Sequence, residues 1–218
     1  MDAGSRSPDD YIGARLRKER ERQGLSVRGL ASRLGISASA LSQIETARSR
    51  PSVGTLYAIV SELGLSFDEL FAQPSSKASR RRPAAAEHHV VQRAGDRPTL
   101  ELESGVRWER LNPTGERDVD FLEVEYDGGG ASSPGGTFVH HAGREYGLVT
   151  SGTLKVTVGF DEYELGPGDS ICFDSAVPHR LETIGDEPAR AIWFVIGRAG
   201  SDARAQWTSE DDGTAPRG

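Results

Sequence analysis

The sequence predicts an α + β protein of two domains, a bundle of five short helices over residues 9–71 and a β barrel or sandwich over residues 97–197. Apolar residues recur at helical spacing in the first region. The second region alternates turns of Gly, Pro and Asp with short β-rich runs, namely Val119–Tyr126, Glu145–Thr150, Thr153–Val158, Ser170–Phe173 and Ala189–Ile196. Residues 72–96, which lie between the two, lack a sustained apolar period and indicate a linker.

Composition narrows the class of protein. The chain of 218 residues has one cysteine, Cys172, which excludes an intrachain disulfide framework and fits a reducing cytoplasm. Because Cys172 lies in a predicted strand, we expect a buried, unreactive thiol. No stretch approaches the roughly 18 apolar residues of a membrane span, and the N-terminus lacks the apolar core of a signal peptide. We therefore expect a cytoplasmic protein with no membrane partner, and disordered polar ends over residues 1–8 and 198–218.

The distribution of charge is more informative than the net charge of −7, which by itself argues against a nucleic-acid partner. Between Tyr11 and Arg50 there are nine basic and three acidic residues, a local balance of +6. A basic first domain on an acidic body is typical of a DNA-binding domain that is joined to a second function.

Apolar spacing and capping residues predict where the five helices lie. The first is expected from about Asp9 to Gln23, and the last is a short turn over Phe67–Phe71. Each of the other three follows a serine that is a good N-cap, namely Ser26, Ser37 and Ser52. The second helix shows the apolar pattern most clearly, because positions i, i+3, i+4 and i+7 hold Val27, Leu30, Ala31 and Leu34.

The second and third helices are joined by Gly-Ile-Ser at residues 35–37, the kind of short connection that allows a helix to enter the DNA major groove. The outward residues of the third helix are small or polar, so they can approach base edges: Ala38, Ser39, Ser42 and Gln43. Gln43 is suited to pair with adenine through two hydrogen bonds. We expect the basic residues on either side of this helix to contact phosphates.

The run LSVRGLASRLGISASALSQIETARSRPSVGTLYAIVSELGLSFDELF resembles the lambda/434 repressor-like family of DNA-binding regulators, also called the XRE family. The resemblance implies a five-helix repressor-like bundle with Ala38, Ser39 and Gln43 at base-contacting positions. It also implies phosphate contacts from Ser37, Thr46 and Arg50, and we expect the basic side chain of Arg48 to contact phosphate as well. The chain departs from the family at two positions: Ala47 replaces a common glycine, and Val27 replaces a glutamine that often binds a phosphate.

Glu45, at the end of the third helix, has two interpretations. Its carboxylate is chemically able to accept a hydrogen bond from a cytosine amine. In the family that the run resembles, this position more often pairs with an arginine of the first helix, and Arg20 occupies the matching place. The resemblance therefore favours a structural ion pair between Arg20 and Glu45, which is costly to break when it is buried.

The second domain contains two runs of a different kind. Residues 136–152, GTFVHHAGREYGLVTSG, and residues 166–180, GPGDSICFDSAVPHR, resemble the two motifs of the cupin superfamily. Three residues separate His141 from Glu145, as in the first of those motifs. The resemblance implies a cupin barrel, a double-stranded β-helix, over residues 97–197.

The first motif is incomplete, because Val139 replaces one histidine of the cupin HxH pair. Strand parity places Val139 and His141 on one face and His140 on the other. The resemblance brings His141, Glu145 and His179 together as two imidazoles and one carboxylate. This set suits a divalent metal such as iron, manganese, nickel or zinc, and three ligands leave coordination positions open.

Three interpretations of these residues remain open. In the first, the barrel has lost its metal and the two histidines line a pocket for an organic ligand. In the second, a bound metal serves sensing or structure. In the third, a bound metal serves catalysis. The run HAGREY at residues 141–146 resembles the iron motif of an epoxidase branch with the same two domains. That branch uses a lysine just before the second helix, where this chain has Gly24. Gly24 argues against the epoxidase activity and leaves another oxygenase open, and overall we expect no enzymatic activity.

The sequence thus favours a homodimeric transcriptional regulator. It predicts sequence-specific binding to a near-palindromic operator in double-stranded DNA, with the cupin domain sensing an unknown small-molecule ligand. The alternative is a metal-dependent cupin enzyme, a mononuclear non-haem oxygenase similar to the epoxidase, in which the helical domain serves assembly.

Overall fold

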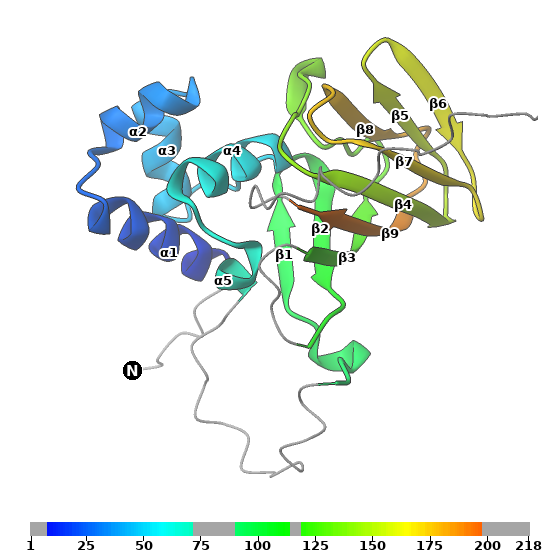
Figure 1. The fold of residues 1–218 in the computed structure, drawn as a ribbon, viewed down its shortest axis with the longest axis horizontal. Helices are drawn as coiled ribbons and strands as arrows, with labels where there is room; N and C mark the ends of the chain where they lie inside the picture. The colour runs from blue at the N-terminus through cyan, green and yellow to red at the C-terminus, as the bar shows by residue number, and fades with distance from the viewer. Residues whose placement is uncertain (1–7, 72–89, 114–118, 198–218) are drawn as a thin grey trace, which may run out of the picture.

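The computed structural model describes residues 8–71, 90–113 and 119–197. Most of the predicted linker and both polar ends lie outside these ranges. The helices occupy one end of the molecule and the strands the other, with α4 lying between them (Figure 1). The helices are α1 (Pro8–Arg22), α2 (Val27–Leu34), α3 (Ala38–Glu45), α4 (Val53–Leu63) and α5 (Phe67–Phe71). None of the helices in the described ranges has both the length and the apolar composition needed to cross a membrane.

Serine side chains begin three of these helices, as predicted. The Oγ atoms of Ser26, Ser37 and Ser52 accept hydrogen bonds from the backbone N–H three residues further on, at 3.0, 3.0 and 3.1 Å. Each bond satisfies one of the N–H groups that a helix start leaves unpaired. Gly35 ends α2 in the left-handed conformation, with φ of 69°. The connection from α2 to α3 is therefore fixed at both ends, and this sets the orientation of α3.

The second part of the chain is a barrel of two antiparallel sheets, which confirms the predicted fold class. The larger sheet has the order β1-β2-β3-β9-β4-β7 and the smaller the order β6-β5-β8. The strands are β1 (Thr99–Leu102), β2 (Val106–Arg110), β3 (Val119–Tyr126), β4 (Arg144–Ser151), β5 (Leu154–Val158), β6 (Asp161–Leu165), β7 (Ser170–Asp174), β8 (His179–Thr183) and β9 (Ala189–Ile196). Every second side chain of β3 and β9 is buried, so these strands turn one face to the barrel interior.

Four strands, β1, β2, β6 and β8, lie outside the β-rich runs that the sequence predicts. Strand β6 has exposed side chains at four of its five positions, so it has no buried side that would produce an alternating pattern. It is held by its pairing with β5, from Leu154 opposite Leu165 to Val158 opposite Asp161. Short 3-10 helices also occur in the connections: η2 (Ala94–Asp96, at the end of the predicted linker), η3 (Glu103–Gly105) and η4 (Pro134–Gly136).

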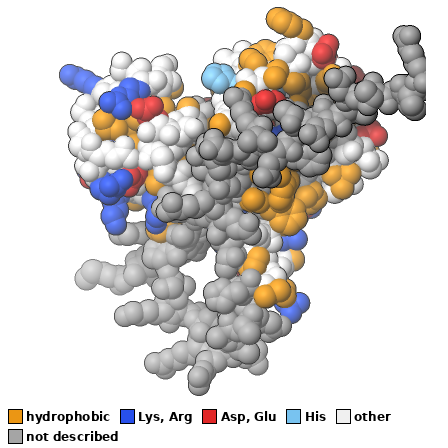
Figure 2. Space-filling view, in the orientation of Figure 1, with side chains coloured by type: hydrophobic (Ala, Val, Ile, Leu, Met, Phe, Trp, Pro, Cys, Tyr) orange, Lys and Arg blue, Asp and Glu red, His pale blue; other side chains and the backbone are white. Residues whose placement is uncertain are grey.

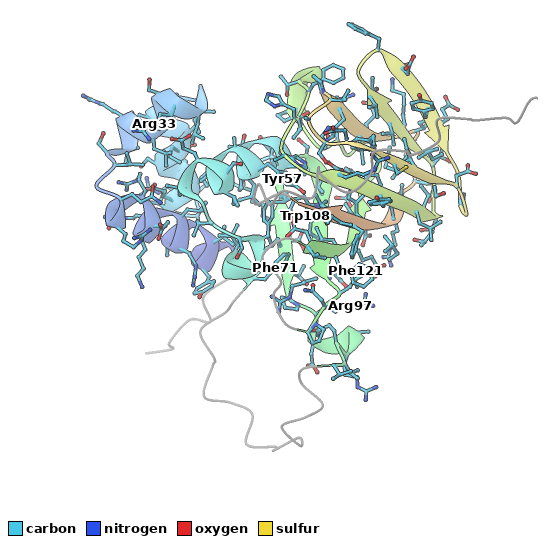
Figure 3. All side chains as sticks on the ribbon, viewed as in Figure 1. Arg33, Tyr57, Phe71, Arg97, Trp108 and Phe121 are labelled. Atoms are coloured by element: carbon cyan, nitrogen blue, oxygen red, sulfur yellow. The ribbon has the colours of Figure 1, made fainter. Side chains whose placement is uncertain are left out.

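The helical bundle and the barrel share one hydrophobic core. Tyr57 of α4 packs edge-on against Trp108 of β2, with ring centroids 5.7 Å apart (Figure 3). Phe67 of α5 packs edge-on against the same indole, with centroids 5.4 Å apart. A backbone hydrogen bond reinforces this contact, since the N–H of Glu103 donates to the carbonyl of Pro51 at 2.9 Å. The bundle is therefore docked on the barrel by direct packing.

The turn after α3 contains a residue in an unfavourable backbone conformation. Ala47 has φ of 54°, in the left-handed region where a Cβ atom is crowded by the backbone. This is the position at which the repressor-like family commonly has glycine. We infer that Ala47 holds about 1 kcal/mol of strain.

We expect Ala47→Gly to raise the free energy of unfolding by about 0.5–1 kcal/mol. Glycine adopts a positive φ without the Cβ clash, although it also gains entropy in the unfolded chain. Denaturant unfolding of the full chain measures the change. The matched control is Ala40→Gly within α3, which should lower stability by about 1 kcal/mol. A loss of stability in both variants would contradict the conformation of Ala47.

Candidate functional sites in the helical domain and the barrel

Helix α3 turns its apolar side chains and Glu45 inward and its other polar side chains to solvent. Leu41 and Ile44 are buried in the core of the bundle. Ser39, Ser42 and Gln43, which the sequence predicts to contact bases, are all exposed. Ala38 is half-buried and packs against the core, so it offers only part of its side chain to a partner.

The four predicted phosphate-contacting residues are exposed around α3: Ser37, Thr46, Arg48 and Arg50. Two of their hydroxyls already make local bonds. Ser37 caps α3, and the Oγ1 of Thr46 donates to the carbonyl of Ser42 at 2.7 Å. Arg48 and Arg50 lie in the segment that leaves α3 toward α4. Figure 2 shows Lys and Arg side chains gathered over the helical domain, as a surface for a polyanion requires.

Arg20 and Glu45 form a buried ion pair that joins α1 to the end of α3. The Nε and Nη2 atoms of Arg20 donate to the two carboxylate oxygens of Glu45 at 2.6 and 2.8 Å. Nη1 donates to the carbonyl of Leu25 at 2.7 Å. The side chains are 6% and 4% exposed, and the hydrogen bond to Glu45 raises the pKa of Arg20 above its ordinary value. The carboxylate of Glu45 is therefore engaged within the bundle and does not face a base.

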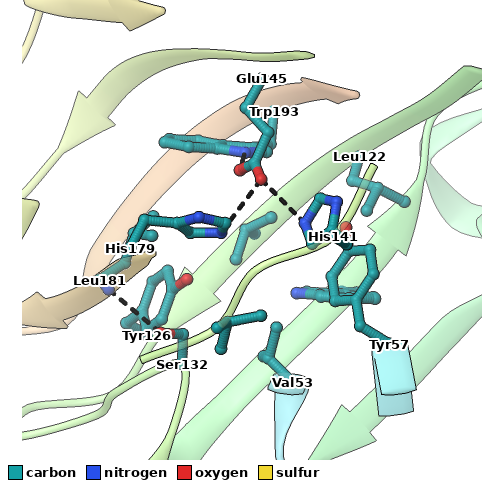
Figure 4. A pocket seen from close by; sticks show the side chains of 13 residues that line it. Val53, Tyr57, Leu122, Tyr126, Ser132, His141, Glu145, His179, Leu181 and Trp193 are labelled. Carbon is teal, nitrogen blue, oxygen red and sulfur yellow. Dashed lines mark hydrogen bonds and ion pairs between the residues drawn. The ribbon is translucent and has the colours of Figure 1, made fainter. Parts of the chain in front are cut away.

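The barrel interior brings together the three residues that the cupin resemblance selects. The Oε1 atom of Glu145 lies 2.9 Å from Nε2 of His141 and 3.2 Å from Nε2 of His179 (Figure 4). The ligand atoms of the three side chains all lie within 4.8 Å of one another, and all three residues are buried. Val139 also faces inward whereas His140 is exposed, as strand parity predicts.

Hydrogen bonds on the far side of each group orient this triad. The Nδ1 atoms of His141 and His179 lie 3.0 and 2.9 Å from the carbonyls of Ala142 and Val177. A carbonyl only accepts, so each Nδ1 carries a proton, and in the neutral ring Nε2 then offers a lone pair. The Nε1 of Trp193 donates to Oε2 of Glu145 at 2.6 Å, which turns Oε1 toward the histidines. Outer bonds of this kind are what a metal-binding site uses to fix its ligands.

The two Nε2 atoms of the histidines and Oε1 of Glu145 need a positive charge between them. Neither Nε2 of His141 nor Oε1 of Glu145 has a hydrogen bond of good geometry, although both are buried. Burial alone would raise the pKa of Glu145, but the close polar contacts and charge of His141 and His179 outweigh it and hold that pKa well below its usual range. Burial likewise opposes protonation of His179, and Glu145 outweighs it, so the pKa of His179 is raised. A proton on His179 or a cation at the centre satisfies this arrangement, and the donor set fits a divalent metal.

Gly147 allows Trp193 to reach the carboxylate. The two residues are opposite one another in the pairing of β4 with β9. A Cβ atom at position 147 would lie 2.0 Å from Cζ3 of the indole, so any side chain there would displace the ring. The absence of a side chain at Gly147 therefore supports the bond from Trp193 to Glu145.

The triad lines a cavity of about 30 Å³. Most of its walls are apolar or aromatic side chains of the strands, but Val53 and Tyr57 come from α4 of the helical domain (Figure 4). Neither residue could be predicted as part of the pocket, because helical spacing identifies the buried side of a helix without showing which domain will cover it.

The expectation that Cys172 is buried is wrong. Its thiol is exposed, because Cys172 lies opposite Tyr146 on the outer face of the large sheet while Phe173 takes the inward position. Arg144 Nη2 approaches the sulfur at 3.7 Å. Alternate residues of a strand face opposite sides of the sheet, and the apolar residues in GDSICFD do not show which of the two sets faces the core.

Comparison with known proteins identifies both parts of the chain. A family model described as "Helix-turn-helix" matches residues 16–70, and one described as "Cupin domain" matches residues 122–195. The HTH-type transcriptional regulator PuuR of Escherichia coli (strain K12) is 27% identical over 180 residues, which cover 83% of this chain and 91% of that protein.

Solved structures include similar chains. An HTH_3 family transcriptional regulator from Vibrio cholerae superimposes with a TM-score of 0.60 and 23% identity, over 86% of this chain and 96% of that one. The hydroxypropylphosphonic acid epoxidase from S. wedmorenis gives a TM-score of 0.41 and 21% identity, over 86% and 98% of the two chains. The first similarity supports the two-part fold, and the second is too low to support an argument.

Breaking the Arg20–Glu45 pair should destabilise the helical domain strongly. We expect Glu45→Leu or Arg20→Met alone to lower the free energy of unfolding by about 3–5 kcal/mol, because each leaves an unpaired buried charge. The double variant should lose much less than the sum. The matched control is Glu62→Ala at the more exposed Arg33–Glu62 pair, with a loss below about 1 kcal/mol. Additive losses in a double-mutant cycle measured by denaturant unfolding would contradict the pairing.

Proposed function

We propose that this chain is a sequence-specific DNA-binding transcriptional regulator, in which a helix-turn-helix domain of the repressor-like type is joined to a cupin barrel that senses a small ligand. The observation that carries this proposal is α3, a short helix with exposed polar side chains in a basic domain, held in place by the buried pair of Arg20 and Glu45. The similarity to PuuR supports it, because that similarity covers 83% of the chain and therefore both domains.

In this proposal Ser39, Ser42 and Gln43 contact base edges, with a smaller contribution from Ala38. Arg48, Arg50 and the hydroxyls of Ser37 and Thr46 contact phosphates and set the position of α3 in the groove. Contacts with phosphates give affinity without sequence preference, so sequence specificity depends mainly on Gln43.

The regulator acts as a homodimer on a near-palindromic operator, with the two α3 helices about one DNA turn apart. The outer face of the barrel supports this proposal. Strand β4 exposes Tyr146 and Leu148 there, and Phe194 and Ile192 of β9 lie opposite them in the pairing. An apolar patch across neighbouring strands is typical of a protein interface.

The barrel holds a divalent metal such as iron, manganese, nickel or zinc through His141, Glu145 and His179. Oε1 of Glu145 and Nε2 of His141 approach one another without a well-oriented hydrogen bond, and this geometry and the bond from Trp193 to Glu145 support the assignment. When bound, the ion supplies a Lewis acid with open coordination positions that a small ligand can occupy. We propose a sensing role for it rather than turnover, because the similarity to PuuR extends over both domains.

Two substitutions separate base contacts from phosphate contacts. We expect Gln43→Ala to weaken binding to the preferred operator by about 1–3 kcal/mol and to relax sequence preference. We expect Arg50→Ala to weaken binding to all sequences and to lower the slope of log K against log salt by about one. Fluorescence anisotropy with operator and scrambled duplexes at several salt concentrations measures both.

The control for this comparison is Arg190→Ala on β9 of the barrel, which should leave DNA binding unchanged. An equal loss of specificity in Gln43→Ala and Arg50→Ala would contradict the residue assignments. Absence of any salt-dependent DNA binding by the wild-type chain would contradict the proposed function.

Metal binding is tested by titrating chelator-treated protein with Mn²⁺ or, without oxygen, Fe²⁺, in a calorimeter. We expect one ion per chain, no binding by His141→Ala, and affinity about 10–100 times weaker for Trp193→Phe, which keeps an aromatic ring but removes the donor to Glu145. The matched control is His140→Ala, which should bind like the wild type because its side chain is exposed. Equal binding by His141→Ala and His140→Ala would contradict the site.

A further inference from the structure

We propose that the sensor site is shared between the two domains: α4 is the lid of the barrel pocket, and a ligand larger than a few water molecules reaches the triad only when α4 moves away. This inference rests on the proposed function and deepens it, because it states how the pocket and the DNA-binding domain are coupled. Pocket occupancy and the docked position of the DNA-binding domain then exclude each other.

The contact between α4 and the triad is direct. The ring of Tyr57 stacks on the imidazole of His141, with centroids 4.0 Å apart and planes 4° from parallel (Figure 4). Tyr57 and Val53 are each only 6% exposed. The backbone of α4 also lies close to the barrel, since a Cβ atom at Gly54 would be 2.9 Å from Cγ2 of Val139. One turn of α4 therefore covers His141 and Val139 together.

The small volume of the cavity supports a movement of this lid. About 30 Å³ accommodates roughly two water molecules, whereas pockets for drug-sized ligands are about 300–1,000 Å³. Val53 and Tyr57 are the lining residues that a rigid movement can remove, because the other lining side chains belong to the barrel itself. An organic ligand that contacts His141 on this side takes the place of the tyrosine ring.

The lid, α4, is connected to α3 by a short segment that is itself held on the barrel. Residues 46–52 separate α3 from α4 and contain Arg48 and Arg50. Within that segment Pro51 and Ser52 are buried, and the carbonyl of Pro51 accepts the bond from Glu103. A displacement of α4 therefore moves or frees the segment next to α3. A ligand that binds the open form better shifts the equilibrium toward that form.

A reversible disulfide tests the lid. In a Cys172→Ser background, Gly54→Cys and Val139→Cys are suitable partners, because a Cβ atom at position 54 would lie 3.9 Å from Cβ of Val139, within the range of about 3.5–4.5 Å found in disulfides. Metal-free protein is treated with diethyl pyrocarbonate, and peptide mass spectrometry gives the modification rate of each histidine. The exposed His140 is the internal control.

We expect His141 and His179 to react at least tenfold more slowly in the oxidised form than in the reduced form, with His140 unchanged. Equal rates in the two forms would overturn the proposal, since the pocket would then be reached by another route. Absence of reaction at His141 and His179 in the reduced form would also overturn it, because α4 would not open. Salt-dependent DNA binding of the same protein is measured separately, so that its loss counts against the proposed function and not against the lid.

A second pair of variants does not depend on forming the disulfide. Tyr57→Ala removes the ring over His141 and should raise the modification rate of His141 at least tenfold. Tyr57→Phe keeps the stacked ring and should leave the rate at the wild-type value. The same rate in both variants would contradict the role of the ring as a cover.

Discussion

The packing of Tyr57 and Phe67 against Trp108 is the aromatic centre of the contact that joins the helical bundle to the barrel. Each of these rings is almost fully buried, and burying a large apolar side chain stabilises a protein by about 1.5–3 kcal/mol. The contact gives the bundle a defined orientation on the barrel and closes the barrel over His141. The orientation of the bundle on the barrel and the closed pocket both depend on this contact.

The carboxylate of Glu145 imposes the second constraint. A buried charge requires partners, and the barrel supplies them from separate strands: the indole of β9, the imidazole at the start of β8, and His141 just before β4. The need of the Glu145 carboxylate for partners explains why these polar side chains hold defined orientations in a largely apolar cavity. It also explains why His141, Glu145 and His179 converge although Val139 stands where the cupin motif has a second histidine.

Much of the helical domain could be predicted from the sequence, because its signals are local. Ser26, Ser37 and Ser52 mark helix starts within three residues of the groups they cap. The strands of the barrel were harder to predict from the sequence. The run DEYEL in β6 has no buried side, and whether Cys172 is buried depends on which face of the sheet meets the core. Tyr57 could not be assigned to the pocket, because its contact with His141 joins residues 84 positions apart in sequence.

Gly147 has a consequence for how this barrel can change over time. Because the indole of Trp193 occupies the space where a side chain would stand, an alanine at position 147 would move the ring and remove a hydrogen bond from Glu145. The carboxylate would then be free to rotate. Ligand preference could therefore drift among descendants of this chain through a position that contributes no atom to the cavity, while the residues lining it keep their chemical identity.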